Sequence, residues 1–110
     1  MAYKFDGTEG APIAHASFKN WVANFQATIG PNDIRAHFFG FRIISRILAL
    51  PGCKGIRIYY GLDDQGKKQL LLVGTDSDGA DLLPATDALM DTEPNIIGDV
   101  SFPCPPYCGK

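Results

Sequence analysis

The segment from Pro31 to Leu50 constrains the fold most, because it is apolar at most of its positions. Gly30-Pro31 precedes it and Pro51-Gly52 follows it, and such pairs are typical of helix ends. We therefore predict one helix that starts at Pro31 or Asn32 and ends at Leu50. At roughly 100° per residue, its apolar side chains form two nearly opposite faces. One face holds Ile34, Phe38, Phe41, Ile44 and Leu48, and the other holds Phe39, Ile43, Ile47 and Leu50.

Only a narrow polar strip remains on this predicted helix. Arg35, Arg42 and Arg46 stand at i, i+7 and i+11, within about 40° of each other around the axis. Guanidinium groups suit carboxylate or phosphate, so this stripe is a candidate anion site. The alternative is that these arginines pair with the Asp-rich turns or are simply exposed. Two apolar faces need two partners, and we expect the second partner to be further protein, such as another copy of the chain.

A second helical stripe lies before this segment. After Ser17, a good N-cap residue, apolar side chains recur with helical spacing at Phe18, Trp21, Val22, Phe25 and Ile29. This pattern predicts a helix from Ser17 to Ile29. Residues 1–16 show no sustained period and are rich in Gly, Ala and Pro, so we expect an irregular N-terminal arm. Residues 17–110 are then expected to form a single domain.

After Pro51-Gly52 the hydrophobic period changes from helical to two. Residues 55–62 alternate in the way that is typical of an amphipathic strand. Residues 63–66 carry Asp first and Gly fourth, as a type I turn prefers, and this indicates a hairpin. Residues 69–75 include four consecutive apolar side chains, so we expect this strand inside the sheet.

The remaining expected elements are shorter. We expect a third strand over 81–83, a helical turn over 85–90 and a last strand over 96–102. The fold class is therefore α+β, with two N-terminal helices followed by a three-stranded antiparallel meander and a C-terminal strand. The alternative is a small curved, barrel-like sheet that the helices cap.

Composition and charge exclude several classes of protein. The chain has 110 residues, and its longest apolar run is interrupted by Arg42 and Arg46, so it lacks the ~20 residues needed to span a bilayer. Residues 1–14 contain no apolar signal-peptide core, so we expect a soluble, cytoplasmic protein. Six bases and three acids give residues 1–55 a charge of +3, and four bases and nine acids give residues 56–110 a charge of -5. We interpret this asymmetry as internal or self-complementary pairing, and a pI of about 5.5 argues against nucleic-acid binding.

The C-terminal segment Pro103-Cys104-Pro105-Pro106-Tyr107-Cys108 is the least generic stretch. A zinc site needs four ligands, and only Cys53 and two isolated histidines remain to complete one, so we favour no metal. A Cys104–Cys108 disulfide is geometrically conceivable, yet a cytosolic chain would normally be reduced. We therefore interpret both cysteines as small apolar residues beside a stiff, extended Pro-Pro-Tyr segment.

Other signatures of chemistry are missing from the sequence. No glycine-rich nucleotide motif occurs, and the acidic turn at residues 76–81 does not match a calcium loop, so we expect no cofactor. His37 lies on an apolar face of the predicted helix, where a core or interface role is expected. No catalytic residue is predicted.

Three segments resemble a family of small bacterial proteins of about this size. They are residues 34–39 (Ile-Arg-Ala-His-Phe-Phe), residues 55–61 (Gly-Ile-Arg-Ile-Tyr-Tyr-Gly) and the C-terminal Pro-Cys-Pro-Pro-Tyr-Cys at 103–108. The resemblance covers residues 17–108. It implies no activity, cofactor or site residue, so nothing functional is carried over from it.

The leading interpretation is therefore a non-enzymatic interaction module that forms a homo-oligomer through the two-faced helix. The sheet edge and the C-terminal segment are further candidate surfaces for a protein partner. A first alternative is a metal- or thiol-dependent protein that uses Cys53, Cys104 and Cys108. A second alternative is a small anionic-ligand binder or enzyme that uses the arginine stripe. The candidate binding residues are Arg35, Arg42, Arg46, Arg57 and Tyr59.

Overall fold

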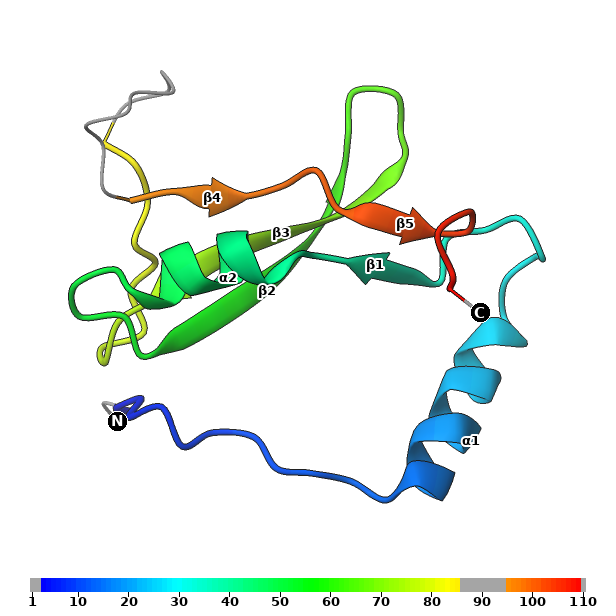
Figure 1. Cartoon of the computed structure of the whole chain (residues 1–110), viewed down its shortest axis with the longest axis horizontal. Helices are drawn as coiled ribbons and strands as arrows, with labels where there is room; N and C mark the ends of the chain where they lie inside the picture. The colour runs from blue at the N-terminus through cyan, green and yellow to red at the C-terminus, as the bar shows by residue number, and fades with distance from the viewer. Residues whose placement is uncertain (1–2, 86–94, 110) are drawn as a thin grey trace. The chain divides into compact units, whose positions relative to one another are not determined.

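The computed structural model describes residues 3–85 and 95–109, and it is an α+β structure (Figure 1). The elements follow in the order α1 (His15–Gln26), β1 (Ala36–Phe38), α2 (Phe41–Leu48), β2 (Gly55–Leu62), β3 (Lys68–Thr75), β4 (Ile97–Gly98) and β5 (Phe102–Cys104). The strands form an antiparallel sheet of order β2-β3-β4 and a separate antiparallel pair, β1-β5. The predicted α+β class is confirmed, and the sheets of the described chain do not close into a barrel.

The chain divides into two compact units. The first, here called the sheet unit, comprises Met1–Glu9 and Phe39–Ser101 and contains α2, β2, β3 and β4. The second, the ribbon unit, comprises Gly10–Phe38 and Phe102–Lys110 and contains α1, β1 and β5. The expectation of a single domain over residues 17–110 stays a prediction.

The β2-β3 hairpin follows the predicted alternation. The strands pair in continuous register from Gly55↔Thr75 to Leu62↔Lys68. In the turn, the Asp63 N–H donates to the Lys67 carbonyl at 2.9 Å, and Asp63 Oδ1 accepts the N–H groups of Gln65 and Lys67, each at 2.9 Å. Since β4 pairs with the other side of β3, the prediction that β3 lies inside the sheet is confirmed.

This turn makes stability depend on acid pH. The hydrogen bond from the Lys67 backbone, followed by that from the Gln69 side chain, lowers the pKa of Asp63. A lowered pKa in the folded state means that the stabilisation is complete above the unfolded-state value of about 4 and is lost as the pH falls through the folded-state pKa. We expect Asp63→Asn to show a smaller fall in Tm than the wild type when thermal melts are run from pH 7 down to pH 3. Asp64→Asn, at the exposed neighbour, is the control, and equal falls for Asp63→Asn and the wild type would contradict the prediction.

The core of the sheet unit lies between α2 and one face of the sheet. Ile47 is fully buried, and Leu72 is 3% exposed. Two glycines let the helix come close: Ile47 Cγ2 lies 3.2 Å from the position a Cβ would take at Gly74, and Ile43 Cγ1 lies 3.2 Å from that position at Gly98. Val73, whose side chain points to the opposite face, is also buried, so β3 carries the apolar side chains of both faces.

The single helix predicted from Pro31 to Leu50 is wrong. Ala36–Phe38 forms strand β1, Gly40 is the N-cap, and only Phe41–Leu48 is helical. The aromatic run before Gly40 suits a strand, and glycine is a poor helix former. The pairing of β1 with β5, more than sixty residues later, decides the conformation. A local hydrophobic period carries no information about such a distant partner.

The residues of the two predicted apolar faces therefore lie in different elements and differ in burial. Ile47 and Leu50 are buried in the sheet unit and Ile43 is half-buried. On the other face of α2, Phe41 is 82% and Leu48 is 49% exposed. Ile34 and Phe38 belong to the ribbon unit.

The boundaries of the first helix also shift. The structure confirms a helix in this part of the chain, but α1 begins at His15 instead of Ser17 and ends at Gln26 instead of Ile29. Its N-cap is Ala14, which makes no side-chain cap hydrogen bond. The described residues before it, 3–14, contain neither helix nor strand.

Later elements differ in detail. The predicted strand over 81–83 is only an isolated bridge, Thr75↔Asp81, and the third strand of the meander is β4. The predicted strand over 96–102 is divided between β4 and β5, which belong to different sheets. Between them Val100 has a φ of 60°, so the chain leaves the extended conformation between the two strands. The helical turn expected over 85–90 lies, beyond Ala85, outside the described residues.

Within residues 3–85 and 95–109, neither helix is long and apolar enough to cross a membrane.

Candidate functional site

A cluster of polar side chains forms around Asp81 in the sheet unit. Arg57 Nη1 donates to Asp81 Oδ1 at 2.7 Å, Thr75 Oγ1 donates to the same oxygen at 3.3 Å, and the Tyr59 hydroxyl donates to Oδ2. Arg57 also donates to the Gly79 carbonyl at 3.0 Å. Its side-chain hydrogen bond with Tyr59, and to a smaller extent the charge of Asp81, raises the pKa of Arg57. The cluster ties the turn at residues 76–81 to the sheet.

The N-terminal residues Tyr3–Glu9, here called the strap, also pack on this turn. The Phe5 N–H donates to the Ser77 carbonyl at 2.8 Å, and Lys4 forms an ion pair with Asp78. The Arg57 guanidinium lies 6.0 Å from the centre of the Phe5 ring, a cation–π contact. The first described residues therefore belong to the folded sheet unit.

A half-open cavity of about 350 Å³ lies between the strap and the start of β2. Lys54, Arg57 and Glu9 supply its charged groups. Two of these already have partners: Arg57 binds Asp81, and the Glu9 carboxylate accepts the N–H groups of Asp6 and Gly7, each at 3.0 Å. Thr75, whose hydroxyl donates to Asp81, also lines the cavity.

The arginine stripe is not formed. Arg35 precedes β1 in the ribbon unit, whereas Arg42 and Arg46 are exposed on α2 in the sheet unit. Of the predicted binding residues, the structure brings together Arg57 and Tyr59. Sequence reasoning missed their shared partner, Asp81, because the Asp-x-x-Gly turn pattern at residues 76–79 indicated only solvated carboxylates.

The C-terminal cysteines form a disulfide. Cys104 and Cys108 are bonded, with their Cα atoms 4.6 Å apart, which corrects our interpretation of them as reduced apolar residues. The segment between them is a turn with two cis peptide bonds, and the Tyr107 N–H donates to the Pro103 carbonyl at 2.9 Å. The expectation of an extended Pro-Pro-Tyr segment is therefore also wrong.

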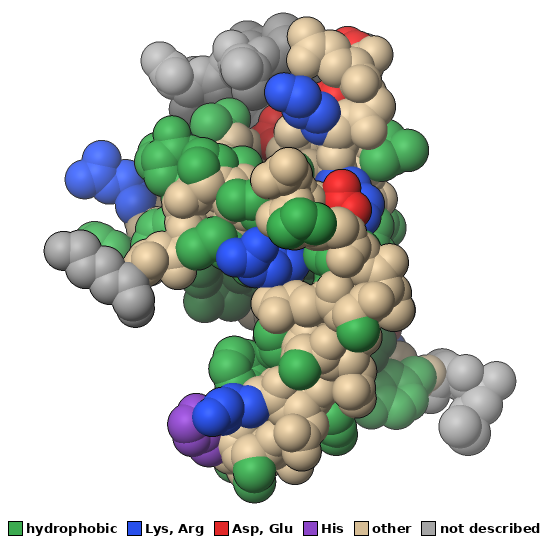
Figure 2. Space-filling model, turned by 90° about the vertical axis from the view of Figure 1, so that its right-hand side faces the viewer, with side chains coloured by type: hydrophobic (Ala, Val, Ile, Leu, Met, Phe, Trp, Pro, Cys, Tyr) green, Lys and Arg blue, Asp and Glu red, His purple; other side chains and the backbone are tan. Residues whose placement is uncertain are grey.

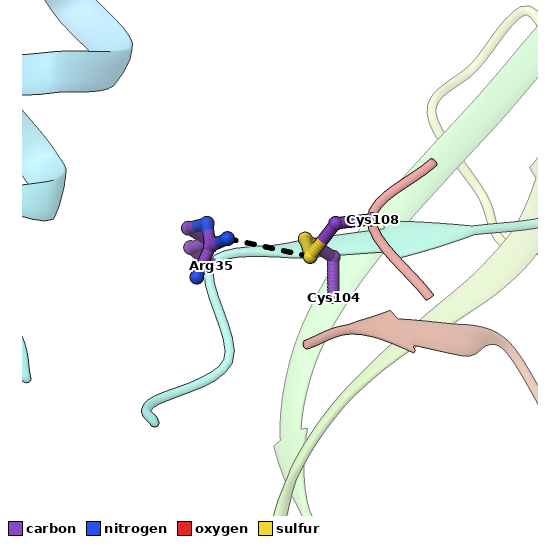
Figure 3. Close-up of a disulfide and its surroundings, with 3 residues drawn as sticks. All are labelled: Arg35, Cys104 and Cys108. Carbon is purple, nitrogen blue, oxygen red and sulfur yellow. Dashed lines mark hydrogen bonds between the residues drawn. A yellow bond between two sulfur atoms is a disulfide. The ribbon is translucent and has the colours of Figure 1, made fainter. Parts of the chain in front are cut away.

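Arg35 is hydrogen-bonded to both cysteines, once through its backbone and once through its side chain. Its N–H donates to the Cys104 carbonyl at 2.8 Å, at the end of the β1-β5 pair. Its guanidinium Nη2 lies 3.3 Å from Cys108 Sγ, in a hydrogen bond (Figure 3). Cys104 is 9% exposed, whereas Cys108 is exposed. The two cysteines therefore differ in exposure, and the Arg35 side chain is hydrogen-bonded to the exposed one.

Cys53 is the one free cysteine among the residues described. Its thiol donates to the Gly55 carbonyl at 3.2 Å in the sheet unit. Across residues 3–85 and 95–109, no three His, Cys, Asp or Glu side chains are grouped so that they could hold a metal ion.

Large apolar side chains are exposed on both units, and Figure 2 shows hydrophobic side chains at many places on one face of the surface. α1 has no buried residue, and the apolar side chains of its stripe are exposed at Phe18, Trp21, Val22 and Phe25. On β2, Ile58 is 55%, Tyr60 is 92% and Leu62 is 72% exposed.

No protein-family model, curated protein or solved structure matches this chain.

Proposed function

We propose that the protein is a non-catalytic self-association module in which the outer edge of β2 pairs with the same edge of a second copy. The proposal rests on the exposure of the outer side of Ile58–Leu62, here called the β2 edge. β2 is the outermost strand of its sheet, so this edge has no strand partner in the described chain. Its side chains at Ile58, Tyr60 and Leu62 are mostly exposed. A long, exposed, apolar edge strand is a template for pairing with another strand.

The backbone direction of the β2 edge supports this pairing. The Asp63 N–H bonds inward to Lys67 across the hairpin. Backbone groups alternate along an antiparallel strand, so those of Gly61 and Tyr59 also point inward. The N–H and C=O groups of Ile58, Tyr60 and Leu62 then point outward, away from β3. The side chains of the same three residues are exposed.

The β2 edge also lacks the sequence features that normally prevent an edge strand from pairing with another chain. The strand contains neither lysine nor proline, and its register with β3 runs without a bulge. Its one charged side chain, Arg57, is bound to Asp81.

A second copy fits this edge in an antiparallel arrangement. A two-fold axis at Tyr60 places Tyr60 opposite its own equivalent and Ile58 opposite Leu62, which joins the apolar side chains of one face. In the same register Tyr59 faces a glycine, Gly61. Lys54, just before β2, then lies towards the turn of the other copy, where Asp64 is exposed.

The oligomeric state tests the proposal. We expect the wild type to be a dimer by size-exclusion chromatography with light scattering at high micromolar concentration. Tyr60→Pro removes an outward N–H, which an edge strand tolerates, and Tyr60→Lys places a charge on the bare face. Both variants are expected to be monomers with an unchanged hairpin.

Trp21→Lys is the matched control, because it removes an exposed aromatic side chain from α1 instead of β2. We expect it to remain dimeric. A strictly monomeric wild type, or a dimer that Trp21→Lys dissociates and both Tyr60 variants retain, would overturn the assignment of the β2 edge.

A further inference from the structure

We propose that the Cys104–Cys108 disulfide is a redox-active site that exchanges with low-molecular-weight thiols, with Cys108 as the exchanging sulfur and Arg35 as its positioning residue. This activity is separate from the proposed self-association, because the disulfide belongs to the ribbon unit and the β2 edge to the sheet unit.

Access distinguishes the two sulfurs. Thiol–disulfide exchange depends on which sulfur an incoming thiolate can reach. Cys108 is exposed, whereas Cys104 is 9% exposed and is held in the β1-β5 pair through its bonded carbonyl. An external thiolate therefore meets Cys108 first, and Cys104 is the sulfur that leaves.

A positive charge next to Cys108 is the second difference between the two cysteines. The Arg35 guanidinium is 3.3 Å from Cys108 Sγ (Figure 3). A neighbouring cation attracts an anionic thiolate to this sulfur, and it stabilises the Cys108 thiolate that leaves when the mixed disulfide is resolved.

The exchange has two steps. The thiolate of a first small thiol attacks Cys108 Sγ, and the bond between the two protein sulfurs breaks. Its electron pair leaves on Cys104 Sγ, which takes a proton from water, and a mixed disulfide remains on Cys108. A second small thiolate attacks the small-molecule sulfur of that mixed disulfide, and Cys108 Sγ leaves with the electron pair beside Arg35. Two small thiols are oxidised to one disulfide, and the protein disulfide gains two electrons and two protons.

Reduction by excess glutathione tests the assignment of Arg35. We expect Arg35→Gln, which keeps the backbone bond to Cys104, to be reduced about threefold more slowly than the wild type. Arg35→Lys keeps the charge and is expected to recover most of the rate. Arg42→Gln removes the same charge from α2 and is the control that should leave the rate unchanged.

The reactivity of the reduced protein gives a second readout. Alkylation of each cysteine is followed by mass spectrometry across pH, and the rise in the rate at Cys108 is expected about one pH unit higher in Arg35→Gln than in the wild type. With oxidised glutathione, Cys104→Ser is expected to form the mixed disulfide at Cys108, and Cys108→Ser to form little at Cys104. Equal rates and equal pH profiles in the wild type and Arg35→Gln, or a glutathione adduct mainly at Cys104, would overturn the proposal.

Discussion

Ile47→Ala is expected to lower the free energy of unfolding by about 2–5 kcal/mol. Ile47 is the largest fully buried side chain described, and it fills the space between α2 and the glycines of β3 and β4. Truncation leaves a cavity that cannot collapse, because Gly74 and Gly98 have no side chains to move into it. Urea denaturation followed by circular dichroism measures the change.

Leu48→Ala is the matched control for this prediction. It removes a similar side chain from the next position of α2, but Leu48 is 49% exposed. We expect it to cost less than 1 kcal/mol, roughly what a half-buried side chain contributes. Similar losses for the two variants would show that α2 does not pack on the sheet through Ile47.

Gly98→Val is expected to destabilise the sheet unit by about 1–3 kcal/mol or more, through overpacking. A Cβ at Gly98 would lie 3.1 Å from Leu72 Cβ and 3.2 Å from Ile43 Cγ1. Leu72 is the register partner of Gly98 on β3. Its Cβ is fixed by the backbone and cannot move aside, so the new side chain must push β4 or α2 away.

Gly55→Val is the control for this variant. Gly55 also lies in a strand, but nothing lies within 4 Å of the position its Cβ would take. Valine favours strands, so we expect the change in stability at this position to be within about 0.5 kcal/mol. A Gly98→Val protein as stable as Gly55→Val would mean that α2 and β4 are not in the close contact described.

The parts of the fold that local pattern determines were predictable. The β2-β3 hairpin follows from alternating side chains and an Asp-to-Gly turn, and both are properties of neighbouring residues. The helical stripe at Phe18–Phe25 likewise predicted α1, although Ser17 proved to lie inside the helix instead of at its cap.

The parts that depend on distant partners were not predictable in this way. β1 exists because it pairs with β5, and the hydrophobic period of residues 31–50 fits a helix equally well. The Arg57–Asp81 pair also joins residues whose proximity depends on how the chain returns after β3. The sequence singled out Arg35, Cys104 and Cys108 for separate reasons, but their meeting in one site depends on the β1-β5 pairing.

The division of the chain into two units has a consequence for how the protein can be dissected. Each unit is assembled from two separated stretches, and the backbone passes between them after residues 9, 38 and 101. No single cut can therefore release either unit intact, and deletion of one terminus removes material from a unit whose remainder lies far along the chain. Recombination of either unit with another protein, in evolution or by engineering, must therefore move both of its stretches together.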